Sequence, residues 1–500
     1  MEVAEEQAID QGQLVLLLQQ ENAALKGRIA HLTFQLEQLK RLIYGTKSER
    51  FVPADPAQST LFAVEASATP PIEQISYQRT KAQDKQPPVR VAIAAHLPRI
   101  EQVIEPSDLP QGAKRIGEEI TETLEYTPAV IEVHKVVRPK YVHEERVLIA
   151  PLPAQPFPKS NLGPSLAAHI CVAKFCDHIP LYRQRAQLGR AGLDVSDSTI
   201  GGWFQATAIL LEPLGDALRK EVLAQNYLQV DESPIPVQQD HQEGSLRRGY
   251  HWVYHAPLIK AVLFDYRPGR SAAFPTEVLR DFHGTLQTDG YVGYEKLAVR
   301  LERPPLGGGS GGVALACMAH ARRYFEKALA NDKVRAEHAL KRIGELYVIE
   351  RHCDEEGFDP DQRKEHRQSR AAPLLDELEK WMRDEIIIVA PKSLIGTAIA
   401  YTLSLWPRLR AYTLDGRYLI DNNRIENTIR PLAIGRKNYL FAGSDRGARH
   451  AALIYSLLGT CKLHGVEPFA YLRDVIQRIS EHKANRLHEL LPKNWSPLAK

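Results

Sequence analysis

An apolar repeat with alternating spacings of three and four residues runs through the first part of the chain. Its positions are Val15, Leu18, Asn22, Leu25, Ile29, Leu32, Leu36, Leu39 and Ile43. Leu fills one set of heptad positions and mostly β-branched residues fill the other, which favours a parallel two-stranded coiled coil with its register fixed by Asn22. We predict a coiled-coil helix within residues 1–50 and a homodimer through residues 15–43. Because only about four heptads are present, an amphipathic helix packed on its own chain is the alternative.

The periodic pattern stops after this helix and returns as short β-type runs. Residues 51–90 are rich in Pro, Ala and Gln and have no period, which is typical of a linker. In residues 91–160, runs such as "EVHKVVRPKYV" and "ERVLIAPLP" alternate with Pro-containing turns. This stretch predicts a small β-containing module.

Two helical patterns separated by a short Gly-containing turn follow in residues 161–225. The stretch "LYRQRAQLGRAGLDVSDSTIGGWFQATAILLEPL" places the turn at residues 191–194 and offers Ser196 as the N-cap of the second helix. This pattern predicts a helix-turn-helix-like DNA-binding segment, with arginines near the phosphates. Those arginines are Arg183, Arg185 and Arg190. Gly201 and Gly202 each cost about 1 kcal/mol in a helix interior, so a plain helical hairpin is the alternative.

Longer apolar runs with strand character begin at residue 226. The runs "NYLQVDESPIPV", "GYHWVYHA" and "KAVLFDYRPGRS" predict three strands, and a helix near "AAFPTEVLRDF" leads to a fourth strand that ends at Asp289. This order predicts the first part of a ribonuclease H-like α/β core over residues 226–330, with the first and fourth strands side by side. Asp231 and Asp289 are therefore expected near the same end of the sheet.

A third carboxylate is expected from the helix that begins "NRIENTIRPLAIGRKNYLFAG". Its polar stripe consists of Asn423, Glu426, Asn427 and Arg430, spaced three or four residues apart. Two close aspartates repel each other unless a cation lies between them, and Glu426 would complete a site for Mg²⁺ or Mn²⁺ that acts on a phosphodiester. The neighbouring amides and arginine would then hold DNA or metal-bound water. A solvated helix face is the alternative.

Charge is concentrated in the last third of the chain. The whole protein has a formal net charge of +3, whereas residues 424–462 contain seven Lys or Arg and two acidic residues, a net charge of +5. Arg436 and Lys437 lie in this segment and are candidates for phosphate contacts. In "ACMAHARRYFEKAL" the start of a helix follows an apolar strand, and its cations are a second candidate set, with a solvated face as the alternative. That set is His320, Arg322 and Arg323.

The cysteine content and the first residues of the chain indicate the cellular compartment. Cysteine is sparse and odd in number, with five residues, which suits a reducing compartment. The first residues are acidic where a secretory signal would be basic, and no apolar run approaches the roughly 20 residues that cross a bilayer. We expect a cytoplasmic protein with no membrane partner, associated with the nucleoid when bound to DNA.

Several motifs resemble those of the bacterial insertion sequence 66 transposases, which are of the DDE type. The motifs are "VDESP", "TDGYVGYEKL", "CMAHARRYFEKAL" and "NRIENTIRPLAIGRKNYLFAGSDRGARHAALIYSLLGTCKLHGVEPFAYLRDV", and the similarity extends over most of the chain. The resemblance implies an acidic triad of Asp231, Asp289 and Glu426 that holds the metal ions. It also implies a helical insertion at residues 331–417, a second part of the core at 418–450 and a C-terminal helical region at 451–500.

The resemblance further implies the reaction and the partners. Metal-activated water would cut DNA at the ends of the element, and the resulting 3′-hydroxyls would attack target DNA, with small accessory proteins from the same element as candidate partners. Many family members carry Cys pairs beside the segment "IGEE", and this chain has none there, so no structural zinc is expected. The alternative function is a non-catalytic DNA-binding regulator with a degenerate nuclease fold. Three intact carboxylates argue against it, because clustered acid beside phosphates does not help binding.

Overall fold

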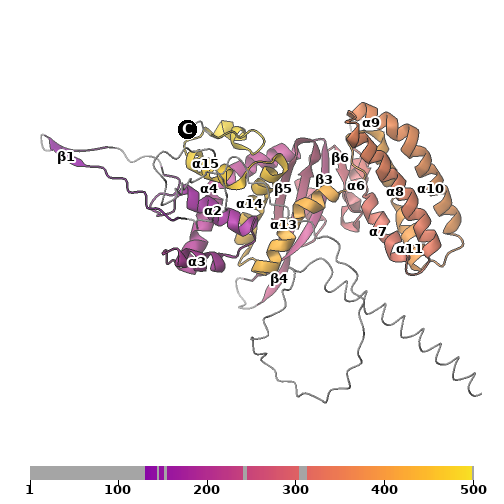
Figure 1. The fold of residues 1–500 in the computed structure, drawn as a ribbon, viewed down its shortest axis with the longest axis horizontal. Coiled ribbons are helices and arrows are strands. Elements are labelled where there is room, and N and C mark those ends of the chain that lie inside the picture. The colour runs from indigo at the N-terminus through magenta and orange to yellow at the C-terminus, as the bar shows by residue number, and fades with distance from the viewer. Residues whose placement is uncertain (1–129, 144–145, 151–154, 240–244, 303–311, 498–500) are drawn as a thin grey trace, which may run out of the picture. The chain divides into compact units, whose positions relative to one another are not determined.

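Residues 130–143, 146–150, 155–239, 245–302 and 312–497 are described by the computed structural model of this protein (Figure 1). The predicted coiled coil at residues 15–43, the predicted linker at 51–90 and most of the predicted β-containing module lie outside these residues. Of that module the structure describes an antiparallel hairpin of β1 (Lys140–His143) and β2 (Arg146–Ile149). None of the described helices is both long enough and apolar enough to cross a membrane.

A mixed five-stranded sheet carries Asp231, and Asp289 follows one of its strands. Its strands are β3 (Tyr227–Gln238), β4 (Leu246–Ala256), β5 (Ala261–Arg267), β6 (Thr285–Gln287) and β7 (Ala314–Leu315). The spatial order is β5-β4-β3-β6-β7, with β4 antiparallel to its two neighbours and β6 parallel to both β3 and β7. The turn η1 (Pro257–Ile259) joins β4 to β5, and α5 (Ala273–Val278) lies in the crossover to β6. The prediction that the first and fourth strands are neighbours is therefore confirmed.

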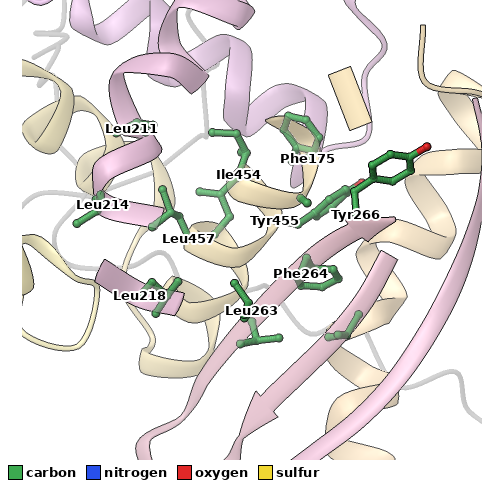
Figure 2. Close-up of a cluster of buried hydrophobic side chains, with 14 of the residues drawn as sticks. Phe175, Leu211, Leu214, Leu218, Leu263, Phe264, Tyr266, Ile454, Tyr455 and Leu457 are labelled. Carbon is green, nitrogen blue, oxygen red and sulfur yellow. The ribbon is translucent and has the colours of Figure 1, made fainter. Parts of the chain in front are cut away.

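Helices that precede and follow this sheet in the sequence pack together, with α4 and α14 against β5. They are α2 (Pro164–Phe175), α3 (Leu181–Arg190), α4 (Asp197–Leu223), α14 (Asp445–His464), α15 (Pro468–Arg478) and η5 (Ala484–Leu490). Figure 2 shows Leu211, Leu214 and Leu218 of α4 facing Leu263 of β5 and Ile454 of α14, and all five are buried. Burial of each such side chain contributes roughly 1.5–3 kcal/mol, so α4 and α14 are held firmly on the sheet.

Side-chain hydroxyls of α14 also complete the hydrogen bonding of β5, which is an edge strand. The Phe264 N–H donates to Ser456 Oγ at 2.8 Å, and the Val262 N–H donates to Thr460 Oγ1 at 3.2 Å. Because these backbone groups have no further strand to pair with among the described residues, α14 protects the edge from pairing with another chain.

The predicted helix-turn-helix-like segment, residues 161–225, contains α2, α3 and α4, and the two helices expected around its turn are α3 and α4. Ser196 is the N-cap of α4, as predicted, and its hydroxyl accepts a hydrogen bond from the Thr199 N–H at 3.1 Å. Gly201 and Gly202 lie inside the helix, and a side chain at either position would meet open space. Their cost in helix propensity is offset because Ile200 beside them is fully buried.

The described residues between β6 and the helix of Glu426 are mostly helical, with β7 between α6 and α7. They contain η2 (Val292–Tyr294), α6 (Glu295–Glu302), α7 (Met318–Ala328), α8 (Lys333–Glu355), α9 (Pro360–His366), η3 (Arg367–Ala371), α10 (Ala372–Glu385), α11 (Leu394–Ser404), α12 (Trp406–Arg410) and η4 (Ala411–Leu414). From α7 onward most of these helices share a second hydrophobic core, which includes Phe325, Ile343, Leu378 and Ile399, whereas η2 and α6 pack into the core of the sheet. This core contains most of the buried apolar residues of the predicted helical insertion, residues 331–417, together with residues of α7 that precede it.

Candidate functional site

Asp231 and Asp289 each lie two residues after a pair of residues that face each other in the adjacent parallel strands β3 and β6. In the β3–β6 register, Tyr227 lies opposite Thr285 and Gln229 lies opposite Gln287. Side chains two residues apart in a strand share a face, so Asp231 shares the face of Gln229. The prediction that the fourth strand ends at Asp289 is wrong by two residues, because β6 ends at Gln287.

A local turn explains the early end of β6 and fixes Asp289. The Asp289 Oδ1 atom accepts a hydrogen bond from the Tyr291 N–H at 2.9 Å, which is an Asx-turn that competes with strand pairing. Gly290 has φ of +84°, a left-handed conformation that favours glycine. The Tyr401 hydroxyl of α11 donates to the Asp289 carbonyl at 2.9 Å. The turn that carries Asp289 is therefore fixed by one hydrogen bond within the turn and by a second one from α11.

Glu426 lies in the first turns of α13 (Asn423–Tyr439), on the polar stripe that the sequence predicts. Ile425, Ile429 and Leu432 are the buried side of this helix. The Glu426 Oε1 atom lies 3.8 Å from His320 Nε2 and 3.7 Å from Arg323 Nη2, and both partners belong to α7. The structure thus joins two of the predicted basic residues to the third carboxylate.

Electrostatics link the three carboxylates. Burial raises the pKa of Asp231, the charges of Asp289, Glu232 and Glu426 act in the same direction, and the resulting pKa is about 8. Burial lowers the pKa of His320, helped by Arg323, while Asp289 and Glu426 act in the opposite direction. A carboxylate that is buried among other carboxylates is unfavourable in its charged form unless a cation compensates it.

The oxygen ligands of this cluster suit a hard divalent cation such as Mg²⁺. Among the described residues, however, no three His, Cys, Asp or Glu side chains lie close enough together to hold one metal ion. Glu426 is directed towards His320 and Arg323 instead. The residues therefore fit a cation in charge and in ligand type, while Glu426 is engaged by side chains of α7.

Glu232 points to the opposite face of β3, as strand alternation requires. Its Oε2 atom accepts a hydrogen bond from the Tyr294 hydroxyl at 2.5 Å, and its Oε1 atom pairs with Arg270 Nη2 at 2.5 Å. Only 3% of the Glu232 side chain is exposed, so this carboxylate is a structural ion-pair partner.

The other basic and amide candidates have different surroundings. On α3, Arg185 pairs with Asp197 at 2.9 Å, and Arg183 and Arg190 are exposed. On α7, Arg322 pairs with Glu326 at 2.5 Å. Along α13 the exposed residues include Asn423, Asn427, Arg430 and Lys437. Arg436 differs from them, since its Nη1 atom donates to Ser233 Oγ at 2.9 Å and to the Pro234 carbonyl at 2.7 Å.

The sequence patterns did not indicate several polar residues behind the carboxylates. Gln229, Gln287 and Asp421 are buried and hydrogen-bonded to one another or to nearby backbone. The available signal was the spacing, because a glutamine stands two residues before each aspartate. This spacing alone does not specify that the two glutamines are buried and paired in adjacent strands.

Comparison with protein-family models gives three matches. The model described as "Transposase IS66 family" matches residues 159–450, the "IS66 C-terminal element" matches residues 456–493, and the "Transposase C of IS166 homeodomain" matches residues 31–101. The last match lies outside the described residues, and the pattern of residues 51–90 gave no indication of a homeodomain-like region.

Two of three curated relatives cover nearly the whole chain. Uncharacterized protein y4jD of Sinorhizobium fredii is 32% identical over 96% of this chain and 97% of its own length. Uncharacterized protein y4qI of the same organism is 34% identical over 94% of this chain and 90% of its own length. Uncharacterized protein YuaK of Escherichia coli is 45% identical over 10% of this chain and 52% of its own length.

Proposed function

The chain belongs to the IS66 family of transposases, and from this premise we propose that it cuts DNA at the ends of an insertion element and joins the 3′-hydroxyls to target DNA. The observation that carries the proposal is the β3–β6 register, in which Asp231 and Asp289 each follow a paired glutamine by two residues, together with a charge on Glu426 that helps to raise the pKa of Asp231. The strand order supports it, because three antiparallel strands followed by two parallel ones is the arrangement of a ribonuclease H-like core.

The proposed site uses the chain's own residues in distinct roles. Asp231, Asp289 and Glu426 would hold Mg²⁺ or Mn²⁺, which when bound activates water and stabilises the charge that develops on a phosphodiester. Arg323 balances the charge of Glu426 and, with His320, forms the side of the cluster where a DNA phosphate would lie. Asn423, Asn427, Arg430 and Lys437 extend along α13 as further contacts to the DNA backbone.

The other parts of the chain have proposed roles in assembly and binding. Residues 15–43 would form the dimer, and α3 and α4 would contact DNA through Arg183, Arg185 and Arg190. The homeodomain-like match at residues 31–101 adds a second DNA-binding region. The protein would then associate with the nucleoid through DNA, with accessory proteins of the element as further partners.

Nicking of supercoiled DNA tests the proposed reaction. The substrate carries the inverted repeats that flank the gene, and the full chain is incubated with it in Mg²⁺ or Mn²⁺ together with any accessory proteins of the element. We expect nicks that leave 3′-hydroxyls at the element ends and that disappear in EDTA. Binding to the ends without any nicking in either metal would favour the non-catalytic regulator.

Replacing Lys437 by Ala should weaken binding to all DNA sequences alike. Lys437 is exposed on the proposed DNA face, so its loss should lower the magnitude of the salt slope by about 1. We choose Lys437 alone because Arg436 is bonded to β3, and its replacement would also disturb the fold. A salt titration of binding measures the slope, with the exposed Lys380 of α10 replaced by Ala as the control. Equal slopes for the two variants would remove Lys437 from the interface.

A further inference from the structure

A buried pair of glutamines lies directly behind the two aspartates. Gln229 precedes Asp231 by two residues on β3, and Gln287 precedes Asp289 by two residues at the end of β6. The Gln229 Nε2 atom donates to Gln287 Oε1 at 2.8 Å, and both side chains are fully buried. The two strands that lead to the aspartates are therefore joined by a side-chain hydrogen bond as well as by backbone pairing.

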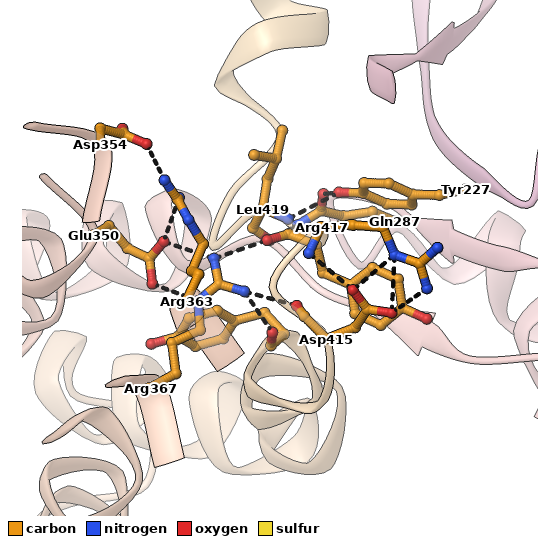
Figure 3. A network of polar contacts seen from close by, with 11 residues as sticks. Tyr227, Gln287, Glu350, Asp354, Arg363, Arg367, Asp415, Arg417 and Leu419 are labelled. Carbon is orange, nitrogen blue, oxygen red and sulfur yellow. Dashed lines mark hydrogen bonds and ion pairs between the residues drawn. The ribbon is translucent and has the colours of Figure 1, made fainter. Parts of the chain in front are cut away.

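The same two amides hold the segment that leads to Glu426. Gln287 Nε2 donates to the Leu419 carbonyl at 2.8 Å, and Gln229 Nε2 donates to the Asp421 carbonyl at 3.0 Å. The Tyr227 hydroxyl donates to Gln287 Oε1 at 2.6 Å and accepts from the Leu419 N–H at 3.1 Å. Figure 3 shows Tyr227, Gln287 and Leu419 together in this contact.

Each polar atom of the two amides has a partner. Gln229 Oε1 faces His255 Nδ1 at 2.9 Å, and Gln287 Nε2 also reaches the Ala316 carbonyl at 3.4 Å. A buried polar network in which every member is satisfied favours one arrangement of the elements it joins, because any shift leaves a buried group unpaired.

The segment held by the glutamines is connected by hydrogen bonds to the start of α13. The Asp421 side chain accepts hydrogen bonds from the Asn423 N–H at 3.0 Å and from the Tyr347 hydroxyl of α8 at 2.8 Å. The Asn422 carbonyl then accepts from the Glu426 N–H at 3.2 Å. Glu426 thus lies one helical turn beyond a segment that is fixed on one side by the glutamines and on the other by the insertion.

We propose that Gln229 and Gln287 are positioning residues that set the spacing of Asp231, Asp289 and Glu426 and so tune the affinity of the cluster for a divalent cation. The inference rests on the proposed function for its metal. Its physical basis is independent of the metal, since one hydrogen-bonded pair joins the strands that lead to Asp231 and Asp289 to the segment that precedes the helix of Glu426. The side chains themselves need not touch DNA or the cation.

Two variants and a control test the proposal in the full-length chain. Gln287→Met removes the amide at similar volume, and Tyr227→Phe removes only the hydroxyl that orients this amide and holds Leu419. The control is Thr460→Val, which removes a similarly buried bond to backbone on the far edge of the sheet. Hydrogen exchange of residues 418–426 reports docking without metal, and titration with Mn²⁺ alone reports the affinity of the cluster.

We expect Gln287→Met to speed exchange of residues 418–426 and to weaken Mn²⁺ binding, each by about tenfold, because one of the links that fix the segment is lost. Tyr227→Phe should give smaller changes in the same direction, and Thr460→Val should change neither. If Gln287→Met does not fold, as judged by circular dichroism, Tyr227→Phe decides.

The outcomes distinguish failure of the positioning role from failure of the proposed metal-dependent function. Unchanged exchange at residues 418–426 would overturn the positioning role whatever the metal does. Faster exchange with unchanged Mn²⁺ affinity would make the pair purely structural and would also overturn it. If the unaltered protein binds no Mn²⁺, the metal-dependent function fails, while faster exchange in the variants would still support docking of the segment by the glutamines.

Discussion

Asp231→Asn should reduce Mg²⁺-dependent nicking by at least about a thousandfold while DNA binding and fold are kept. The amide has nearly the same shape as the carboxylate but is a poor ligand for a hard cation, so activation of the attacking water is lost. Asp289→Asn and Glu426→Gln should reduce nicking to a similar extent and should also keep DNA binding and fold. Pairing two of these changes should cost little beyond one, because residues that act as a unit are not additive. Nicking of supercoiled DNA that carries the element ends measures the effect.

The same substitution should stabilise the metal-free protein at high pH. The pKa of Asp231 is raised to about 8 in the folded state from 3.8, so the folded state holds a proton that the unfolded chain releases. The free energy of unfolding of the unaltered protein therefore falls as pH rises from about 4 to about 8, and the Asp231→Asn substitution removes this loss. We expect the variant to be more stable by roughly 3–5 kcal/mol at pH 8 in EDTA and equally stable below pH 4. Urea unfolding at the two pH values checks this.

Glu232→Gln is the matched control for Asp231→Asn. It removes a carboxylate from the adjacent residue, but from the face of β3 that pairs with Arg270 and Tyr294. We expect stability to fall while most nicking activity remains. If Asp231→Asn nicks at the rate of the unaltered protein, Asp231 is not a metal ligand and the catalytic assignment fails.

Local patterns were enough to predict the elements that carry the site. Strand alternation placed Asp231 and Glu232 on opposite faces, and helical spacing placed Glu426 on the polar stripe of α13. The cap at Ser196 was also predicted, because N-capping depends only on residues within one turn. In each case the physical cause lies within a few residues of the feature.

Features that depend on distant contacts could not be predicted in this way. The bond from Arg436 to Ser233 spans 203 residues, and the bond from Gln229 to the Asp421 carbonyl spans 192 residues. No period in the sequence encodes such a partner, so Arg436 was indistinguishable from its exposed neighbour Lys437. A local contact can also contradict the strand pattern. The Asx-turn at Asp289 is a side-chain hydrogen bond within three residues, and it ends β6 before the residue at which the sequence pattern predicts the end.

Arg367→Met should strongly destabilise the helical insertion. Outside the carboxylate cluster, we expect this substitution to cause the largest decrease in the free energy of unfolding. Arg367 is fully buried and forms a double contact with Glu350, through Nε at 2.7 Å and Nη2 at 2.6 Å (Figure 3). It also donates to the carbonyls of Tyr412, Asp415 and Tyr418 at 2.8–2.9 Å. One guanidinium therefore fixes α8 to the segment that returns to the sheet.

Loss of this guanidinium leaves Glu350 with Arg363 as its remaining partner and removes a donor from each of three carbonyls, of which that of Asp415 keeps the Tyr418 N–H. Breaking a buried ion pair by removing one member costs about 3–5 kcal/mol, and we expect a loss in this range. Arg367→Lys should recover only part of it, because an ammonium cannot reproduce the planar fork of donors. The control is Arg383→Met, whose pair with Glu379 is exposed and should change stability by less than about 1 kcal/mol.

Urea unfolding followed by circular dichroism measures both variants, and a separate early transition would show that the insertion unfolds before the sheet. Because Tyr418 immediately precedes the segment docked by Gln229 and Gln287, the insertion's loss should also loosen α13. We therefore expect Arg367→Met to lower nicking at metal concentrations below saturation, with partial recovery in excess Mn²⁺. A stability loss no larger than that of Arg383→Met would show that Arg367 does not fix the return segment.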